Sequence, residues 1–433
     1  MVVSERDVVA KLTWRLMPIL AAAYFVAIVD RSNIGVAALT MNHDLGLSSA
    51  AFGFAAGVFF IPYVLLELPS NLALARFGAR WWIARIMLTW GLISAAHALA
   101  WNGPSLYALR ALLGAAEAGL VPGVIFYLTL WFPAAYRGRI ISAFMLAIPV
   151  ALVVGTPISA LLLQLDGIMG LRGWQWMYIL ESLPAAILAI FIPFILPGSP
   201  KDAKFLTGPE REWLIRRLDQ DKGGQGSSDP ADHGSRWLQA LLNPQVLLFC
   251  LMYYGLTNLN GAVSTFLPQI LKERGFGSVQ TGFIATIPYA FGALGMLALG
   301  ALADRPGKRV PANFAALTIA VLGFLSASST NDPMLKLASL SFAAFGAFAA
   351  IPVFWGLPTS LFGGAAAAAS IALINALGNI SSVVNPWVIG LLRDRGADYN
   401  GGLHWLAAMA GLSALVLTII VGLRGRFSYN RVG

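Results

Sequence analysis

The chain has 433 residues, of which 58% are hydrophobic and only 11% are charged. Soluble globular domains carry about 25% charged residues, so this composition excludes an ordinary soluble protein and indicates side chains that face lipid or other apolar helices. The formal net charge of +9 belongs on the loops of such a membrane protein, which leaves no soluble basic face for a nucleic-acid partner.

Twelve apolar stretches are each long enough to cross a bilayer, which takes about 20 residues of α-helix. Six of them lie in the first half of the chain, at residues 16–39, 50–74, 82–101, 105–131, 139–165 and 175–196. Six more lie in the second half, at residues 241–269, 279–302, 310–328, 334–357, 367–392 and 402–423. The sequence therefore predicts an all-α membrane protein with twelve transmembrane helices in two six-helix bundles.

One long polar segment separates the two halves. Its glycine- and serine-rich stretch at residues 223–228 is typical of a flexible linker, and residues 209–220 are predicted to form a short surface helix. We therefore expect an N-terminal six-helix bundle at residues 1–197, a cytoplasmic linker at 198–240 and a C-terminal six-helix bundle at 241–433.

The distribution of Lys and Arg predicts the orientation in the membrane. With the N-terminus in the cytoplasm, 21 of the 29 basic residues lie on the cytoplasmic side and 6 on the outer side, while Arg31 and Arg110 lie inside helices. Basic residues accumulate in cytoplasmic loops. We expect a monomeric, multi-pass protein of the inner membrane with both termini in the cytoplasm.

Two loops at matching positions of the two halves have a similar pattern. The sequence RFGAR at residues 76–80 follows the second predicted helix, and RPGKR at residues 305–309 follows the eighth. The second loop, with Asp304 before it, resembles the signature loop of the major facilitator superfamily. In the first loop Ala75 stands where the general pattern has Asp, which resembles the anion:cation symporter branch of that superfamily.

Four further segments resemble the same branch. They are DRSNI at residues 30–34, RALLGAAEAGLVPG at 110–123, WQWMYILE at 174–181 and INALGN at 374–379. The resemblance covers both halves and implies secondary active uptake of a small carboxylate by rocking of two six-helix bundles. It also implies a gating role for loop residues that latch the bundles, namely Arg76, Arg80, Asp304, Arg305 and Arg309.

Four ionisable residues lie within helices of the first half: Asp30, Arg31, Arg110 and Glu117. Each costs about 2.5–3.5 kcal/mol near the bilayer centre, so they must pair or line a wet cavity. Arg110 and Glu117 are two turns apart, roughly 10.5 Å, so each is expected to find its main partner elsewhere. We predict that Arg110, with Arg31, holds the substrate carboxylate, and that Asp30 and Glu117 take up protons. Interhelical salt bridges without a transport role are the alternative.

Other candidates are less specific. Tyr63 is predicted either to donate its hydroxyl to the substrate or to pack in the core. Asn375 and Asn379 share a helix face and are predicted either to bind the substrate or to bond neighbouring helices, and Trp355 is a further substrate-binding candidate. Glu67 and Glu181 are predicted to lie near helix ends as structural or gating charges.

The sequence offers little support for an enzyme. Its four histidines have no metal-binding spacing, and neither a nucleophile elbow nor a phosphate-binding loop of the GxxxxGK[ST] kind is present. We therefore predict proton-coupled uptake of a small organic anion, with the proton as coupling ion and neither cofactor nor metal. A proton-antiport exporter of drugs or metabolites is the alternative, and a membrane-embedded enzyme or passive channel is less well supported.

Overall fold

The computed structural model describes residues 4–223, 243–257, 259–358, 364–396 and 398–429. The described residues form helices, turns and loops, and no strand occurs among them. The predicted short helix of the linker is present as α10, Gly208–Gly223. The remainder of the predicted linker, from residue 224 onward, lies outside the described residues.

Twelve helical segments in the described part of the chain are long and apolar enough to span a membrane, which confirms the predicted number. The largest difference is at the start, where α1 runs from Glu5 to Asp44 and begins 11 residues before the predicted position. Acidic side chains in its first turn, Glu5 and Asp7, favour a helix N-terminus there. At 1.5 Å per residue α1 is about 60 Å long, roughly twice the hydrocarbon thickness of a bilayer.

By their internal contacts the residues form two compact units. Unit 1 comprises Met1–Asn33, Ile61–Gly155 and Leu162–Ser227, and unit 2 comprises Ile34–Phe60, Thr156–Leu161 and Ser228–Gly433. Helix α1 and the helix at Ala147–Leu162 each contribute residues to both. The predicted division along the chain, at residues 197 and 240, stays a prediction.

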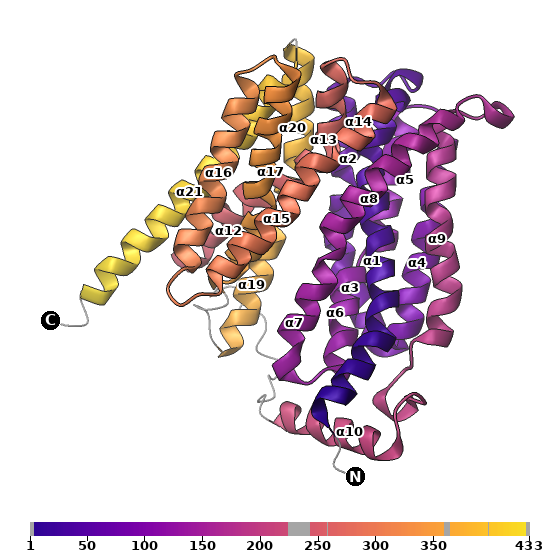
Figure 1. Cartoon of the computed structure of the whole chain (residues 1–433), viewed down its shortest axis with the longest axis vertical. Helices are drawn as coiled ribbons and strands as arrows, with labels where there is room; N and C mark the ends of the chain where they lie inside the picture. Colours follow the sequence, from indigo (N-terminus) through magenta and orange to yellow (C-terminus); the bar gives the residue numbers. More distant parts are fainter. Residues whose placement is uncertain (1–3, 224–242, 258, 359–363, 397, 430–433) are drawn as a thin grey trace. The chain divides into compact units, whose positions relative to one another are not determined.

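Unit 1 is built mainly from helices of the first half of the chain, and α4 packs against both α5 and α9 (Figure 1). Its fully buried large side chains include Trp90, Tyr127, Trp131 and Tyr178. Besides α10 and part of α1 its helices are α3 (Phe60–Phe77), α4 (Ala79–Ala96), α5 (Gly103–Glu117), α6 (Leu120–Trp131), α7 (Ala134–Met145), most of α8 (Ala147–Leu162) and α9 (Gly173–Ile195). Short 3-10 turns, which include η1 (His97–Leu99), lie between some of them.

Helix α10 is fixed to the rest of unit 1 by hydrogen bonds to two segments, α1 and α7, and lies beside the start of α1 (Figure 1). Lys11 Nζ donates to Glu210 Oε1 at 2.6 Å, and Asp221 Oδ2 accepts the backbone N–H of Ala134 at 2.7 Å. Leu214 and Leu218 are buried beneath it. The bond from Lys11 holds the pKa of the Glu210 carboxyl below its usual value.

Unit 2 contains most of the second half of the chain. Its helices are α2 (Ser49–Val58), α12 (Pro244–Leu256), α13 (Leu259–Glu273), α14 (Ser278–Ile284), α15 (Thr286–Ala303), α16 (Arg309–Ser328), α17 (Pro333–Trp355), α19 (Gly364–Gly378), α20 (Ser381–Arg395) and α21 (Asn400–Tyr429). The most extensive contacts in unit 2 are those of α17 with α15 and α16, and those of α2 with α20.

Helices α2 and α20 approach each other closely because the contact surface carries glycine. A Cβ atom on Gly53 would lie 2.1 Å from the carbonyl oxygen of Pro386. The carboxylate of Asp394 caps α2, accepting the backbone N–H groups of Ser49 and Ala50 at 2.8 Å each. Small residues of this kind allow close helix packing in membranes.

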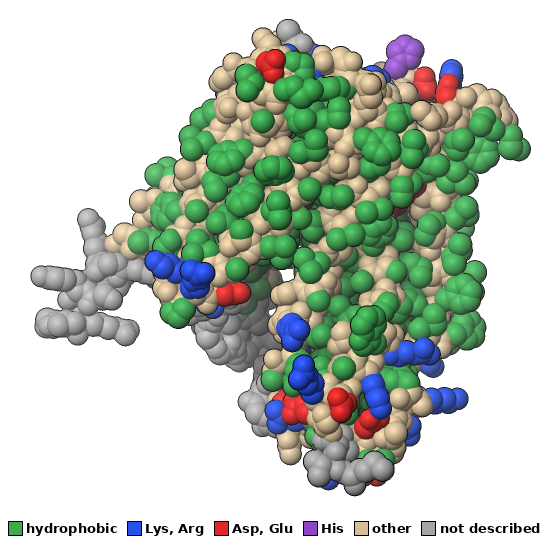
Figure 2. Space-filling view, in the orientation of Figure 1, with side chains coloured by type: hydrophobic (Ala, Val, Ile, Leu, Met, Phe, Trp, Pro, Cys, Tyr) green, Lys and Arg blue, Asp and Glu red, His purple; other side chains and the backbone are tan. Residues whose placement is uncertain are grey.

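On the face that Figure 2 shows, hydrophobic side chains cover the outward surfaces of the helices in both units. Large exposed examples are Leu65 and Phe194 in unit 1 and Leu294 in unit 2. A surface of this kind is stable against lipid tails but not against water. It supports a multi-pass membrane protein, as the composition predicts.

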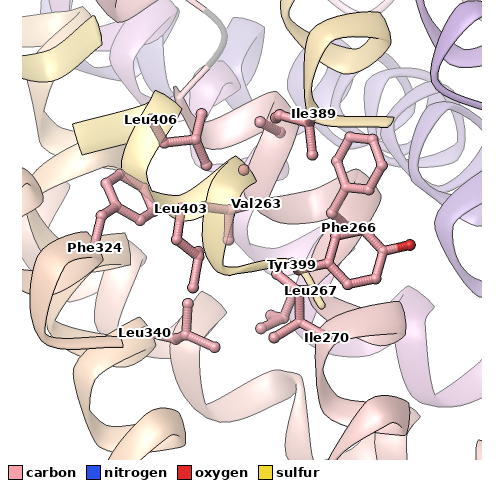
Figure 3. Close-up of a pocket in the computed structure, with 12 residues that line it drawn as sticks. Val263, Phe266, Leu267, Ile270, Phe324, Leu340, Ile389, Tyr399, Leu403 and Leu406 are labelled. Atoms are coloured by element: carbon pink, nitrogen blue, oxygen red, sulfur yellow. The ribbon is translucent and has the colours of Figure 1, made fainter. Parts of the chain in front are cut away.

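A small cavity in unit 2 has an apolar lining, which Figure 3 shows with Leu340 and Leu403 facing Leu267. The hydroxyl of Tyr399 points away from the cavity and donates to Gln269 Oε1 at 2.7 Å. A carboxylate placed among these hydrocarbon groups would lack hydrogen-bond donors. The cavity is therefore unsuited to an organic anion.

Candidate functional site

Asp30 is buried in unit 1, 2% exposed, and three side chains donate hydrogen bonds to it. Trp90 Nε1 donates to Oδ2, and Ser94 Oγ donates to Oδ1. Asn33 Nδ2 also donates to Oδ1, at 3.3 Å. Because Trp90 and Ser94 lie one turn apart on α4, both can reach a single carboxylate on α1. These donors satisfy a buried negative charge.

Asn33 extends this network to α9, because the same Nδ2 atom donates to Glu181 Oε2 at 3.0 Å. The prediction that Glu181 lies near a helix end is wrong. Helix α9 begins at Gly173, which places Glu181 about two turns inside it, and the side chain is buried. The sequence places the start of this helix at residue 175, two residues after the observed start at Gly173, which brings the predicted helix end closer to Glu181.

Arg31 forms an ion pair with Glu117, and Nε donates to Oε1 at 2.7 Å. The Glu117 side chain is fully buried, whereas the Arg31 side chain is 22% exposed. The guanidinium also lies over the ring of Tyr63, with Cζ 4.8 Å from the ring centroid. Three predicted site residues from α1, α3 and α5 are thus in direct contact.

Glu117 ends α5 at a break in the transmembrane segment. Proline at position 122 has no N–H group and cannot bond to the carbonyl of Ala118, four residues earlier. That carbonyl instead accepts a hydrogen bond from Ser70 Oγ at 2.6 Å. Gly119 follows with a φ of 89°, in the left-handed region where glycine carries no steric cost, and α6 begins at Leu120. The break therefore places Glu117 at a helix terminus inside the unit.

Arg110 is buried on α5, 2% exposed, within electrostatic range of Asp30, Glu117 and Tyr178. The ring of Tyr178 stacks on His97, with centroids 5.0 Å apart. His97 Nδ1 lies 2.9 Å from the carbonyl oxygen of Ile93, and because a carbonyl only accepts, Nδ1 carries the proton. The stacked rings of Tyr178 and His97 therefore form part of the environment of Arg110.

Unit 1 thus brings together all five of its predicted site residues outside the gating loop: Asp30, Arg31, Tyr63, Arg110 and Glu117. The expectation that Arg110 and Glu117 find their main partners elsewhere holds for Glu117, because it pairs with Arg31 of α1. The cluster can bind an anion through guanidinium groups and hold protons on carboxyl groups. The roles assigned to individual residues stay predictions.

The candidates of the second half lie in one neighbourhood of unit 2. Asn379 Nδ2 donates to the carbonyl and to Oδ1 of Asn375, at 2.9 and 3.1 Å. Tyr253 joins them to Trp355, because its ring lies against Gly378 and its centroid is 4.9 Å from that of Trp355. Helix α19 ends at Gly378, so Asn379 also lies at a break in a transmembrane segment.

The predicted gating residues lie at helix ends or in the turn beside one. Arg76 is in the last turn of α3, Arg80 is in the first turn of α4, and Arg309 is the first residue of α16. Arg76 lies over Phe77, and Arg80 lies over Trp81. Arg309 Nη1 donates to the carbonyl of Gly356, at the end of α17, at 3.1 Å. Asp304 follows α15, and Arg305 is exposed beside it. Their gating role stays a prediction.

Sequence reasoning missed several polar side chains of the unit 1 cluster, namely Asn33, Ser70, Trp90, Ser94 and Tyr178, and missed Tyr253 beside the unit 2 candidates. Asn33 and Tyr178 lie in segments that carry the family resemblance, and their position one turn from Asp30 or Glu181 is a usable signal. Ser94 and Trp90 carry no such signal, because Ser and Trp are common in transmembrane helices without a polar partner.

Residues 20–386 match the sequence model of the Major Facilitator Superfamily. A protein of Agrobacterium vitis, provisionally named a tartrate transporter, is 40% identical over 417 residues, which are 96% of this chain and 92% of that protein. The quinolone resistance transporter of Acinetobacter baumannii is 41% identical over 418 residues, which are 96% of this chain and 95% of that protein.

The structure is also similar to a bacterial homologue of the human lysosomal transporter Spinster in an inward-facing and occupied conformation. The TM-score is 0.75, over 94% of this chain and 96% of that chain. At 16% identity this similarity shows the fold alone, and it confirms the predicted fold class. The chain therefore belongs to the Major Facilitator Superfamily, a family of membrane transporters.

Proposed function

We propose that this transporter takes up a small organic carboxylate together with protons. The observation that carries the proposal is the ion pair between Arg31 and Glu117, which joins a partly exposed guanidinium to a fully buried carboxylate at 2.7 Å. A substrate carboxylate has the same shape and charge as the Glu117 carboxylate, and it can replace it on Arg31.

Exchange of one carboxylate for another gives a coupling mechanism. When the substrate binds Arg31, Glu117 loses the charge that stabilises its ionised form. A buried carboxylate without a cation favours protonation, so substrate binding and proton uptake by Glu117 occur together. Release of the substrate restores the ion pair and frees the proton. Arg110 adds positive charge behind this site, and Tyr63 orients the Arg31 guanidinium.

Asp30 is the second proposed proton carrier. Trp90 Nε1 and Asn33 Nδ2 can only donate hydrogen bonds, so both favour the ionised carboxylate. The hydroxyl of Ser94 can also accept, and it can reverse its hydrogen bond when Asp30 is protonated. Arg110 lies within electrostatic range of Asp30, so substrate binding beside Arg110 also alters the charge balance around this carboxyl group.

The distribution of basic residues supports an inner-membrane transporter with both termini in the cytoplasm, because 21 of 29 basic residues then lie on the cytoplasmic side. We propose a monomer in which the proton is the coupling ion. The name of the Agrobacterium vitis relative supports a hydroxylated dicarboxylate as substrate.

Uptake of radiolabelled tartrate into proteoliposomes, driven by an imposed pH gradient, tests the proposal. Wild-type protein should accumulate tartrate only while the gradient lasts. Glu117→Gln should still exchange tartrate across the membrane but should no longer accumulate it, and Glu210→Gln on α10 is the matched control that should behave as wild type. Accumulation by Glu117→Gln that still follows the pH gradient would refute the exchange mechanism.

A second candidate function is export of a drug in exchange for protons. The 41% identical relative from Acinetobacter baumannii, which is named for quinolone resistance, favours it. The direction of flux separates the two functions. If the protein is an exporter, proteoliposomes loaded with a quinolone should release it when the outside solution is made acidic. Tartrate should have no effect on that release.

A further inference from the structure

One amide group serves two buried carboxylates in unit 1. Asn33 Nδ2 donates to Asp30 Oδ1 at 3.3 Å and to Glu181 Oε2 at 3.0 Å. Asn33 is fully buried, and Asp30 and Glu181 are 2% and 7% exposed. Two carboxylates that share one neutral donor and are buried from solvent repel each other when both are ionised.

Counting the charges of the cluster leads to the same conclusion. Among the described residues, Asp30 and Glu117 lie within electrostatic range of Arg110, and Glu117 also pairs with Arg31. Glu181 adds a third buried carboxyl group, and Glu67 on α3 adds a further carboxyl group within range of Arg31. With all groups ionised, the buried cluster would carry a net negative charge, which a low-dielectric interior disfavours. One proton held by the cluster reduces this charge.

The excess proton belongs on the pair that shares Asn33. Arg31 is already bonded to Glu117. Of the described groups, Arg110 and Glu117 on α5 lie within electrostatic range of Asp30. Tyr178 on α9 lies within range of both acids of the pair, with His97 on η1 stacked on its ring. His97 donates from Nδ1 to a backbone carbonyl, so it is neutral when only that nitrogen is protonated. Arg110 supplies a single positive charge for two carboxyl groups.

We propose that Glu181 is a third proton-carrying carboxyl group of the transporter, and that Asp30 and Glu181 hold one proton between them across the Asn33 amide. The inference rests on the proposed proton coupling for its role in transport. The proton binds a carboxylate oxygen from water and returns to water, so one O–H bond forms and later breaks without any redox change. Asn33 is the positioning residue that keeps the two acids together.

The Asn33 amide suits both protonation states. With Glu181 ionised, Nδ2 donates to it. With Glu181 protonated, its O–H group can donate to Asn33 Oδ1, a buried atom for which the described residues supply no hydrogen-bond donor. The two acids therefore titrate as a coupled pair.

Infrared spectroscopy of the purified, substrate-free protein in detergent tests this inference. A protonated buried carboxyl group gives a C=O stretching band that is distinct from that of a carboxylate. Wild-type protein should show the band near neutral pH, and Glu181→Gln should lose it. Asn33→Leu should shift its frequency, because the acid loses its amide partner, whereas Glu210→Gln should leave it unchanged.

An unchanged band in Glu181→Gln would overturn the inference. If that variant does not fold, Glu181→Asp replaces it, and the band should then shift in frequency because the shorter side chain changes the hydrogen bond to Asn33; an unshifted band would again overturn it. Since no substrate is needed, failure here is separate from failure of tartrate uptake. A band that depends on Glu181 in a protein that never accumulates tartrate would contradict the proposed function alone.

Discussion

The two units differ in what their interiors contain. Unit 1 buries acidic, basic and histidine side chains in its interior, namely Asp30, His97, Arg110, Glu117 and Glu181. In the described part of unit 2 the corresponding buried group is Lys336, which lies near the start of α17 and donates to Asn400 Oδ1 at 2.7 Å.

Neutral groups and small residues take the place of charge in unit 2. Asn385 Oδ1 accepts the indole N–H of Trp405 at 3.0 Å, and Gly53 lets α2 approach α20. The two units are therefore stabilised by different interactions. Removing a charged group should lower the free energy of unfolding most in unit 1, whereas adding volume to a side chain should lower it most in unit 2.

The largest effect is expected from breaking the buried ion pair of unit 1. Arg31→Leu leaves Glu117 without its ion-pair partner, which should lower the free energy of unfolding by about 3–5 kcal/mol. The double variant Arg31→Leu with Glu117→Leu should recover most of that stability but not tartrate uptake. Thermal unfolding in detergent measures both variants.

Trp405→Phe is the matched change in unit 2, because it removes a neutral donor from Asn385. It should cost only about 1–3 kcal/mol, the usual cost of one buried unsatisfied polar atom. A cost for Arg31→Leu no larger than that for Trp405→Phe would break the distinction between the units.

Adding volume at the α2–α20 contact sharpens the comparison from the other side. Gly53→Ala places a methyl group against the backbone of Pro386, which should cost about 1–3 kcal/mol because the helices must separate. Gly411→Ala on α21 is the control, since a Cβ atom there meets nothing within 4 Å, and it should be neutral or stabilising. Equal melting temperatures for the two variants would show that the close contact is unimportant.

A smaller effect is expected from the break between α5 and α6. Ser70→Ala removes the donor to the Ala118 carbonyl and should cost about 1 kcal/mol. Because that bond fixes the helix terminus that carries Glu117, proton-driven tartrate uptake should fall further than stability alone explains. Ser182→Ala, which removes a bond within a single helix, should leave uptake unchanged.

The twelve helices were predictable from the sequence because crossing a bilayer demands about 20 apolar residues, whatever the tertiary structure. The pairing of Arg31 with Glu117 was not, since residues 86 positions apart meet only after α1 and α5 have packed. Burial requires a partner for each charge but does not select it.

The break after Glu117 illustrates the same limit. Pro122 and Gly119 signal a local distortion of the helix in the sequence. That Ser70 satisfies the freed carbonyl depends on the packing of α3, which no local pattern reveals. Likewise, the donors of Asp30 on α4 become visible only in the structure, because Ser94 and Trp90 are unremarkable in an apolar helix.

The smallest effect is expected at the surface of unit 1, where Lys11 bonds to Glu210. This bond lowers the folded-state pKa of Glu210 below its ordinary value of 4.5, so its stabilisation is present above that pH and is lost as the pH falls through the lower folded value. Lys11→Met should therefore cost less than about 1 kcal/mol at neutral pH, as expected for a partly exposed pair. The difference in melting temperature from wild type should disappear on acidification, and Arg6→Met, an exposed cation of the same helix, should show no such pH dependence. A difference that persists in acid would assign the role of Lys11 to packing of its methylene groups against α10 rather than to charge.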